Sequence, residues 1–382
     1  MYNVLKLNKI AAVGIERLGM DYHVADACEN PDAVLVRSAS MHDMELPNTL
    51  KAIARAGAGT NNIPIEKCTE EGIAVFNTPG ANANAVKELV LAGMLLTSRD
   101  ILGGIEWAKT LKGNGDQVGK MVEKGKSQFA GSELKGKILG VVGLGAIGAL
   151  VANAAVALGM DVIGYDPFLS VEGALKLDPS IKYTAKLDDI YAESDFITLH
   201  LPLNDKTKGT ICAETINKMK KGVRIMNFAR DGLVNSEDLL KALSDDTVAA
   251  YVTDFATDDI LGTKNVIAMP HLGASTGESE DNCAIMAADE IKAYLENGSV
   301  INSVNLPNMK LGPMLPTSAR VCIIHENKPN TFNDIIGSFT STTSVESKTR
   351  GNIAYTVVDT ELGFISSDLP FIDGVIKVRI IR

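Results

Sequence analysis

Short runs of apolar, largely β-branched residues alternate along this chain with longer segments of helical periodicity. The runs predicted to be strands are 34–36, 72–75, 138–142, 162–165, 196–199, 223–227 and 266–269. A segment such as 149–158, which follows one of these runs, has the apolar spacing of a helix. Strands that alternate with helices in this way build parallel sheets from βαβ units. The pattern therefore predicts an α/β protein with doubly wound parallel sheets.

Two segments interrupt the alternation. Residues 103–136 are rich in glycine and lysine and contain the single tryptophan, Trp107, and we place a domain crossing near them. Residues 305–316 contain prolines and glycines that disfavour regular structure. The predicted domains are one formed by residues 1–93 and 277–305, a second over 94–276, and a small α+β domain over 319–382 after a linker at 306–318.

The composition of the chain argues against several classes of binding partner. The formal net charge is -10, which argues against binding to a phosphate backbone. No apolar run approaches the roughly 18 residues of a membrane span, and residues 1–10 lack the apolar core of a signal peptide. The five cysteines lie far apart without a CxxC pair or a metal-binding cluster. We expect a cytoplasmic protein with reduced cysteines and no metal, nucleic-acid or membrane partner.

A glycine motif between a predicted strand and a predicted helix carries the first functional signal. In this setting Gly143 would permit a tight turn, Gly145 would let a pyrophosphate approach the backbone, and Gly148 would let the helix pack on the strand. The first amides of the helix would face the phosphates. The residues expected to bind the dinucleotide phosphates are Gly143, Gly145, Ala146, Ile147 and Gly148.

An acidic residue, Asp166, ends the next predicted strand, 18 residues after Gly148. A carboxylate at this point accepts hydrogen bonds from the adenosine ribose and repels a 2′-phosphate, which favours NAD over NADP. The alternative is a glycine turn with a solvated aspartate. The strand–turn–helix context favours the dinucleotide.

Three later segments, each ending a predicted strand, contain the residues needed for hydride transfer from a secondary alcohol. His271 suits the base that takes the hydroxyl proton, and a carboxylate beside it would orient the imidazole. Arg230 can hold a substrate carboxylate through two hydrogen bonds. Taken singly, Arg230 could be a surface ion-pair partner, His271 a turn residue, and Asp258 and Asp259 a solvated loop. Together they predict the dehydrogenation of a small 2-hydroxy acid.

Over nearly its whole length the chain resembles the D-isomer-specific 2-hydroxyacid dehydrogenases. The segments that carry the resemblance are 36–40, 55–63, 77–86 and 270–276. It implies a Rossmann-type cofactor domain over 94–276 and a flavodoxin-like substrate domain in the first part of the chain. Within the family, the loops are most similar to those of members that oxidise 3-phosphoglycerate to 3-phosphohydroxypyruvate with NAD, the first step of L-serine biosynthesis.

The resemblance also assigns roles to individual residues. It makes Arg230 and His271 catalytic and places Arg37 and Arg55 on loops that face the phosphate and carboxylate of the substrate. The alternative for both arginines is surface charge, and Asn77 could cap a helix instead of meeting substrate. The further residues carried over are Ser38 and Asn77 for the substrate, and His200, Pro202, Ala229, Asp254 and Gly273 for the cofactor.

One position departs from the family pattern. The family has a glutamate where this chain has Asp259, with Asp258 beside it. We select Asp259 because it lies five residues after Asp254, which is the usual spacing between these two acidic positions in the family. Its side chain is one methylene shorter, so the carboxylate reaches the imidazole only if the loop moves inward.

The last segment resembles an ACT domain, an amino-acid-sensing module, over 319–329 and 351–359, with 372–379 expected to form a closing helix and strand. In serine-inhibited members, residues corresponding to His325 and Asn327 bind serine. A second asparagine is expected where Ser344, Val345 and Glu346 stand, and the helix expected before them is a Ser/Thr run over 338–344 with poor helix propensity. The sequence therefore does not predict whether L-serine inhibits the protein. An exposed strand edge favours self-pairing, so we expect a homodimer or homotetramer.

Two other functions remain as alternatives. The first is a reductase of hydroxypyruvate or glyoxylate, against which Arg37 and Arg55 argue because such substrates carry no phosphate. The second is a non-catalytic, NAD-sensing binding protein on the same fold. Arg230 and His271 argue against the second alternative, whereas the shortened acid at Asp259 slightly favours it.

Overall fold

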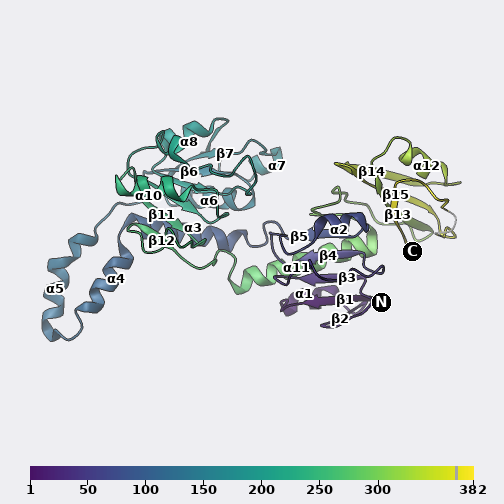
Figure 1. Cartoon of the computed structure of the whole chain (residues 1–382), viewed down its shortest axis with the longest axis horizontal. Helices are drawn as coiled ribbons and strands as arrows, with labels where there is room; N and C mark the ends of the chain where they lie inside the picture. The colour runs from purple at the N-terminus through teal and green to yellow at the C-terminus, as the bar shows by residue number, and fades with distance from the viewer. Residues whose placement is uncertain (366–368) are drawn as a thin grey trace. The chain divides into compact units, whose positions relative to one another are not determined.

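The computed structural model describes residues 1–365 and 369–382, which divide into two compact units (Figure 1). The first unit contains residues 1–82 and 277–382, and the second contains residues 83–276. The α/β fold class with parallel sheets and a small C-terminal sheet is confirmed.

The first unit is built on a five-stranded parallel sheet with the strand order β2-β1-β3-β4-β5, which is the flavodoxin-like order. Its long helix α11 packs against α1 so closely that a Cβ on Gly14 would lie 2.6 Å from Ala284. The strand predicted at 72–75 begins two residues later, because Gly72 lies in a turn with φ +66°. The elements are β1 (Tyr2–Leu7), α1 (Ala12–Leu18), β2 (Tyr22–Ala25), β3 (Ala33–Val36), β4 (Ala52–Arg55), α2 (Ile65–Glu70), β5 (Ala74–Asn77) and α11 (Gly277–Asn297).

The second unit contains a seven-stranded parallel sheet with the order β12-β11-β10-β9-β6-β7-β8. Adjacent β-residues point to opposite faces, and each face has its own core: α3 and α6 cover Val141 and Met226, whereas α8 and α10 cover Val142 and Ile225. This is the doubly wound arrangement. The strands are β6 (Ile138–Val142), β7 (Asp161–Tyr165), β8 (Lys182–Thr184), β9 (Phe196–Leu199), β10 (Val223–Asn227), β11 (Val248–Thr253) and β12 (Val266–Ala268). The helices α3 (Ala83–Ser98), α6 (Ala146–Ala157), α7 (Val171–Ala174), α8 (Leu187–Glu193), α9 (Ala213–Ile216) and α10 (Ser236–Ser244) connect them.

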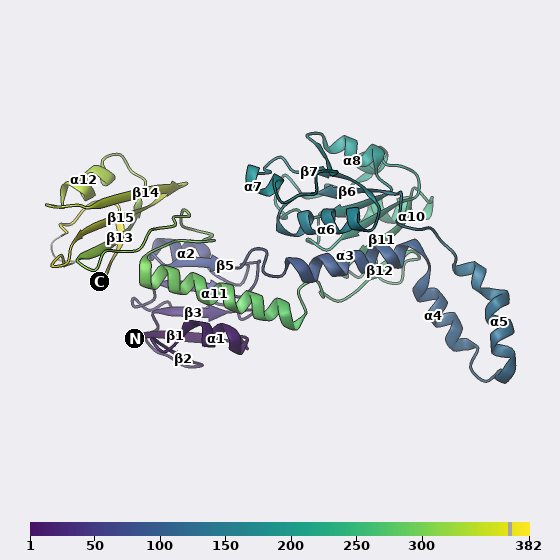
Figure 2. The same cartoon turned by 180° about the vertical axis from the view of Figure 1, so that it is seen from behind.

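The glycine-rich segment that interrupts the sequence pattern is helical in the structure. It forms α4 (Ile101–Thr110) and α5 (Val118–Gly125), with 3-10 turns at Gly115–Gln117 and Lys126–Phe129. The side chain of Asp100 caps α4 by accepting the Gly103 amide at 2.9 Å. Figure 2 shows the two helices as a hairpin that extends away from the sheet of the second unit.

The C-terminal part of the first unit is a four-stranded antiparallel sheet with the order β14-β15-β13-β16. Its elements are β13 (Ser318–Glu326), α12 (Thr331–Gly337), β14 (Ser344–Arg350), β15 (Ile353–Glu361) and β16 (Val375–Ile381). Two expectations were wrong. The Ser/Thr run is a bend between α12 and β14, consistent with its poor helix propensity, and residues 372–374 form a turn instead of the closing helix.

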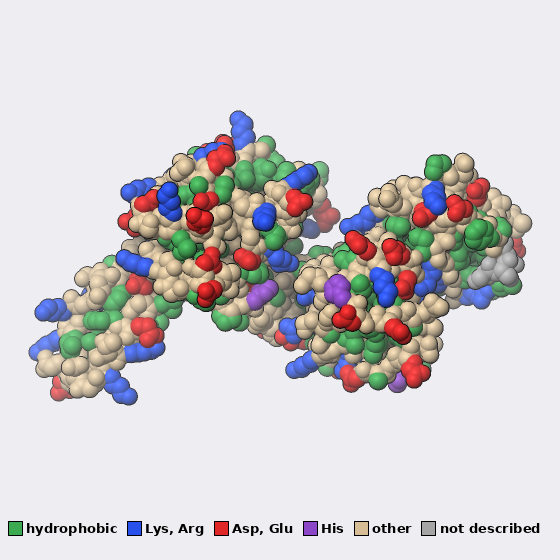
Figure 3. Space-filling model, viewed as in Figure 1, with side chains coloured by type: hydrophobic (Ala, Val, Ile, Leu, Met, Phe, Trp, Pro, Cys, Tyr) green, Lys and Arg blue, Asp and Glu red, His purple; other side chains and the backbone are tan. Residues whose placement is uncertain are grey.

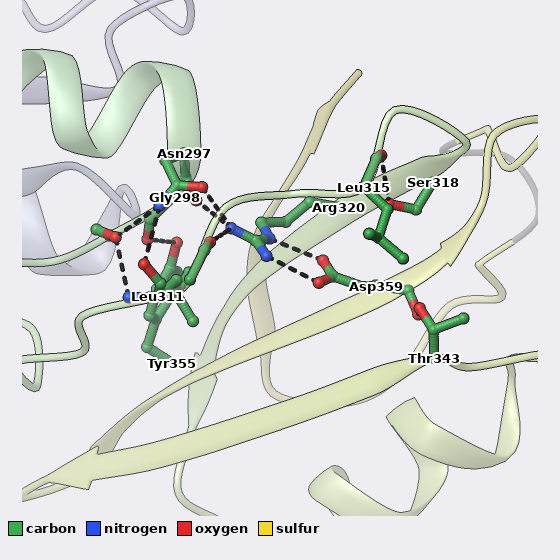
Figure 4. Close-up of polar contacts among 11 residues, drawn as sticks. Asn297, Gly298, Leu311, Leu315, Ser318, Arg320, Thr343, Tyr355 and Asp359 are labelled. Atoms are coloured by element: carbon green, nitrogen blue, oxygen red, sulfur yellow. Dashed lines mark hydrogen bonds and ion pairs between the residues drawn. The ribbon is translucent and has the colours of Figure 1, made fainter.

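A buried arginine ties this sheet to the rest of the first unit (Figure 4). Arg320 on β13 forms a two-pronged ion pair with Asp359 on β15, at 2.7 and 2.8 Å. Its remaining nitrogen donates to the carbonyl oxygens of Asn297, at the end of α11, and of Gly312, each at 3.0 Å. The two sheets also share an apolar core in which Tyr355 lies beside residues of α11.

The surface carries acidic and basic side chains that are interspersed on the face shown in Figure 3. Within residues 1–365 and 369–382, no helix combines the length and the apolar character that crossing a bilayer requires.

Candidate active site

The residues singled out for cofactor and catalysis lie at one edge of the seven-stranded sheet. Parallel strands share the direction of their carboxyl ends, so the loops after them meet at the same edge. Arg230 follows β10, Asp254 follows β11 and His271 follows β12, on three strands that are neighbours in the sheet. The structure thus brings these three loops of the second unit together.

The glycine turn after β6 has the geometry of a dinucleotide-binding loop. Gly143 has φ +96°, and a Cβ there would lie 2.5 Å from the carbonyl oxygen of His200. A Cβ on Gly148 would lie 1.8 Å from the carbonyl oxygen of Gly143, so helix α6 can approach the turn only with glycine at this position. Nothing lies within 4 Å of a Cβ built on Gly145, which leaves open space for a phosphate beside the backbone. Ala146 and Ile147 form the first turn of α6.

Asp166 lies directly after β7, beside the glycine turn. Its carboxylate accepts the amide of Leu144 at 2.9 Å and the amide of Phe168 at 2.8 Å. These bonds fix the carboxylate and leave further lone pairs for ribose hydroxyls.

His200 follows β9 and is a half-buried residue whose Nε2 lies 3.0 Å from the Thr198 hydroxyl. Burial lowers the pKa of His200 to about 3, so its imidazole is neutral. Pro202 is exposed two residues further along, and its carbonyl oxygen accepts the hydroxyl of Thr207. A neutral, hydrogen-bonded imidazole, on a residue whose backbone lies against Gly143, is consistent with a structural role for His200.

Arg230 is exposed, and its loop is held by a residue that the sequence analysis missed. The buried Asn227 donates from Nδ2 to the Arg230 carbonyl oxygen at 2.9 Å and accepts the Ala229 amide at 3.2 Å. Arg230 itself donates to the Ala229 carbonyl oxygen at 2.6 Å. A polar residue at the end of an apolar strand, three positions before an arginine, is the signal that identifies Asn227.

Asp254 is buried at the end of β11. Its Oδ2 accepts the amide of Gly273 at 2.8 Å, whereas its Oδ1 is buried and has no hydrogen-bond partner among the described residues. Burial raises the pKa of Asp254, and the nearby His271 acts in the opposite direction. A buried carboxylate oxygen without a partner is suited to receive a donor from a ligand.

His271 is exposed, and its ring lies 4.7 Å from the ring of Phe255, centroid to centroid. The exposed Asp259 accepts the hydroxyl of Thr257 at 2.5 Å. The hydroxyls of Thr257 and Ser236 lower the pKa of Asp259. The described contacts therefore join Asp259 to hydroxyls of its surroundings and do not include a hydrogen bond to His271.

The substrate candidates of the first unit lie at the carboxyl edge of its own sheet. Arg37 follows β3 and forms an ion pair of 2.9 Å with Glu280 on α11, and the amide of Ser38 donates to Asn8 at 3.1 Å. Arg55 ends β4 and donates from Nε to the Arg37 carbonyl oxygen at 2.9 Å. Asn77 pairs in register with Arg55 and donates to the Ala58 carbonyl oxygen at 2.5 Å.

The two candidate regulatory residues, His325 and Asn327, differ in burial. His325 is buried on β13, with Nδ1 2.8 Å from the Glu326 carbonyl oxygen and Nε2 2.8 Å from the Thr356 hydroxyl. Burial lowers the pKa of His325. Asn327 is exposed after the strand, and its backbone N–H donates to the carbonyl oxygen of Asn352 at 2.8 Å. The histidine thus has partners for both ring nitrogens inside the chain.

Comparison with known proteins identifies the second unit. Residues 92–273 match the family model described as the NAD binding domain of D-isomer specific 2-hydroxyacid dehydrogenases. The glycine turn, Asp166 and the loops that carry Arg230, Asp254 and His271 all lie within the matched residues.

Curated relatives of this chain include several D-3-phosphoglycerate dehydrogenases. That of Synechocystis is 35% identical over 312 residues, which are 79% of this chain and 54% of the relative. That of Methanocaldococcus jannaschii is 37% identical over 75% of this chain and 55% of its own length. The Bacillus subtilis protein is 36% identical over 81% of this chain and 60% of its own length. The chain thus spans little more than half the length of these relatives.

Two solved structures are similar over most of the chain. The NAD-bound 3-phosphoglycerate dehydrogenase of Entamoeba histolytica is 28% identical with a TM-score of 0.60, covering 80% of this chain and 98% of that one. A glyoxylate reductase from Paecilomyes thermophila is 25% identical with a TM-score of 0.66, covering 80% and 98% respectively.

Proposed function

We propose that this protein is an NAD-dependent 3-phosphoglycerate dehydrogenase, which oxidises the C2 hydroxyl of 3-phospho-D-glycerate to give 3-phosphohydroxypyruvate, as expected for the first step of L-serine biosynthesis. The observation that carries the proposal is the placement of Arg230, Asp254 and His271 after three neighbouring strands of an NAD-binding family domain. The similarity to curated D-3-phosphoglycerate dehydrogenases supports the choice of substrate.

The residues present fit an NAD molecule. Gly145 leaves room for the pyrophosphate, Asp166 would bind the ribose, and the orphaned Oδ1 of Asp254 would accept the carboxamide of the nicotinamide. His200, Pro202, Ala229 and Gly273 would line the same sheet edge. The bound cofactor would supply the hydride acceptor.

His271 would remove the proton from the C2 hydroxyl at one of its ring nitrogens, as the C2–H bond gives up its hydride. Arg230 would bind the substrate carboxylate and polarise the carbonyl oxygen that forms. The Phe255 ring against the imidazole limits its rotation. We propose that Asp259 orients His271 once the loop over 257–259 moves, because its present hydrogen bond is to Thr257.

The first unit would supply the contacts to the rest of the substrate. We propose that residues 1–82 form the substrate domain, in which Arg37 and Arg55 bind the phosphate while Ser38 and Asn77 add neutral hydrogen bonds. Two guanidinium groups on neighbouring strand ends are suited to a doubly charged phosphate.

The ion pair between Arg37 and Glu280 favours a second candidate function. At 2.9 Å the carboxylate of Glu280 offsets one of the two charges offered to a phosphate. A substrate without phosphate, such as hydroxypyruvate or glyoxylate, would need only Arg230. The similarity to a glyoxylate reductase structure is in keeping with this alternative.

NADH oxidation by the purified chain would decide between the two. We expect kcat/KM for phosphohydroxypyruvate to exceed that for hydroxypyruvate and glyoxylate by at least about 100-fold, since a bidentate phosphate contact contributes about 3 kcal/mol. The preference should disappear in Arg55→Gln. Faster turnover of hydroxypyruvate would establish the reductase, and no turnover of any of the three would contradict a dehydrogenase.

We propose that the four-stranded antiparallel C-terminal sheet is an ACT-like regulatory module. Because both ring nitrogens of His325 already have partners, an amino acid such as L-serine would bind through Asn327 and the neighbouring loop only if His325 exchanged one of them. Serine titration of the same NADH assay tests this proposal.

A further inference from the structure

A small pocket opens at the amino-terminal edge of the seven-stranded sheet, the edge opposite the glycine turn. It has a volume of about 220 Å³, and its lining includes Ser132, Lys137, Asp195, Lys220, Lys221 and Arg224. We call it the amino-edge pocket. Lys137 immediately precedes β6, Asp195 immediately precedes β9, and Lys221 lies two residues before β10. Because these three strands are neighbours in the sheet, their beginnings meet in one place.

Charge is concentrated in the amino-edge pocket. Four of its side chains are cationic and one, Asp195, is anionic, in a chain whose net charge is -10. Both carboxylate oxygens of Asp195 have partners within the chain: Oδ2 accepts the Ile138 amide at 2.8 Å, and Oδ1 forms an ion pair with Lys220 at 3.2 Å. Asp195 therefore positions Lys220 at the pocket and offsets one of the four positive charges.

The other cations have capacity for a ligand. Arg224 donates from Nε to the Thr97 carbonyl oxygen at 2.8 Å and stacks over Phe196 at 5.2 Å, which fixes its guanidinium. Among the described residues, its two terminal nitrogens make no hydrogen bond. Burial lowers the pKa of Arg224, which means that its charge is poorly solvated. Among the described residues, neither the Lys137 nor the Lys221 ammonium has a hydrogen bond or an ion pair, and Lys221 acts on Asp245 only through longer-range electrostatics.

A hydroxyl in the lining gives an independent indication of a ligand. The Ser132 oxygen is buried and has no hydrogen-bond partner among the described residues. The Ser132 backbone is held at the pocket because its amide donates to the Ser98 carbonyl oxygen at 2.9 Å. Buried hydroxyls are ordinarily hydrogen-bonded, so this one lacks a partner that an oxyanion would provide.

We propose that the amino-edge pocket binds a small, multiply charged oxyanion of the phosphate class, through the ammonium groups of Lys137 and Lys221, the guanidinium of Arg224 and the hydroxyl of Ser132. The volume accommodates inorganic phosphate or the phosphate end of a three-carbon metabolite. Binding would join the beginnings of β6, β9 and β10 to the loop at Ser132 and so stabilise the second unit. The site is separate from the catalytic edge and does not depend on dehydrogenase activity.

Calorimetric titration of the full chain tests the proposal, with excess NADH present and ionic strength held constant. The ligands are inorganic phosphate, 3-phosphoglycerate and glycerate. The pocket variant is Lys137→Gln with Lys221→Gln, and the control is Lys109→Gln with Lys126→Gln, which removes equal charge from exposed positions on the helical hairpin. A third variant, Ser132→Ala, removes only the hydroxyl.

We expect phosphate to bind the wild type and the control alike and to bind the pocket variant at least tenfold more weakly, with a smaller loss in Ser132→Ala. If only 3-phosphoglycerate binds the pocket variant more weakly than the control, the ligand is the phosphate group of a metabolite. If inorganic phosphate and 3-phosphoglycerate both do so, free phosphate is sufficient for binding. Equal affinities in the pocket variant and the control for both phosphate and 3-phosphoglycerate, or binding of neither ligand to the amino-edge pocket of the wild type, would overturn the proposal. Catalytic binding of 3-phosphoglycerate would be the same in both double variants.

Discussion

Asp254 accepts the amide of Gly273 with one carboxylate oxygen, at 2.8 Å, and holds the other oxygen buried without a partner among the described residues. The contact joins the ends of β11 and β12, the two strands that precede Asp254 and His271. The position of the His271 loop is thus linked to the group that we propose binds the nicotinamide.

The first prediction concerns Asp254→Asn. The amide can keep the bond to Gly273 with its oxygen, but its NH2 group cannot accept a hydrogen bond from the cofactor. We expect NADH affinity to fall about tenfold, near 1.4 kcal/mol, with little change in thermal stability. Fluorescence titration with NADH measures the affinity, and Asp258→Asn, at an exposed position in the same loop, is the control. Unchanged affinity in Asp254→Asn would remove Asp254 from the cofactor site.

The second prediction contrasts two glycines of the same turn. Gly148→Ala places a methyl group 1.8 Å from the Gly143 carbonyl oxygen, and we expect a loss of about 1–3 kcal/mol in the free energy of unfolding. Gly145→Ala meets nothing within 4 Å, so the fold should keep its stability while NADH binding is lost. Denaturant unfolding and NADH titration of both variants check this. Normal NADH binding by Gly145→Ala would mean that the phosphates lie elsewhere.

The third prediction is that His271→Ala loses turnover and keeps NADH affinity. Removal of a general base lowers the rate by about 100- to 10,000-fold, whereas the imidazole makes no contact required for the fold. Steady-state kinetics and NADH titration separate the two effects. His23→Ala, at an exposed position on β2, should behave as the wild type. Retained turnover in His271→Ala would exclude it as the base.

The fourth prediction tests which acid orients the histidine. Asp259→Glu restores the longer side chain typical of the family, and we expect kcat/KM to rise about tenfold. The matched change Asp258→Glu should have no effect. Asp259→Asn should lower kcat/KM and shift the acid limb of the pH–rate profile, because the imidazolium would lose its partner. A gain in Asp258→Glu instead would transfer the role to Asp258.

The residues whose roles these four predictions test were all identified from the sequence. Physical reasons explain which secondary-structure elements were predicted correctly and which were missed. The strands at 138–142, 196–199 and 223–227 were predicted with the boundaries found in the structure, because buried parallel strands are continuous apolar runs bounded by turns. The helical hairpin of α4 and α5 was missed because its glycines outweighed the Asp100 cap and the apolar spacing of Ile101 and Ile105.

The candidate site was predicted less completely than the fold. Loops after parallel strands converge whatever their sequence, so the order of Arg230, Asp254 and His271 along the chain was sufficient to place them at one edge. The partners of each side chain depend on distances that no motif encodes. The Thr257 hydroxyl on Asp259, Glu280 on Arg37 and the two partners of His325 are all contacts of this kind.

The fifth prediction concerns a buried acid outside the proposed site. Glu290 on α11 is 2% exposed; its Oε1 accepts Asn302 at 2.8 Å and its Oε2 has no hydrogen-bond partner among the described residues. Burial raises the pKa of Glu290 from 4.5 to about 8. The folded state therefore keeps a proton that the unfolded chain releases, so this group lowers stability as the pH rises from about 4.5 to about 8.

Glu290→Gln should abolish that part of the pH dependence. The variant should be more stable than the wild type by a few kcal/mol at pH 8 and nearly equal to it at pH 4.5, since the amide mimics the protonated acid. Urea unfolding at the two pH values is the measurement. A wild type whose stability rises over this interval relative to the variant would show that Glu290 is ionised in the folded protein.

The bond between Arg320 and Asp359 has a consequence for any shortened form of this chain. A protein cut before β13 would leave the carbonyl oxygens of Asn297 and Gly312 without their guanidinium donor and would expose to water the face of α11 that Tyr355 now covers. Such a fragment would be prone to aggregation. Altered kinetics in it would reflect damage to the first unit as much as the removal of the proposed regulatory module, so single substitutions at Asn327 are the sounder route to the regulatory question.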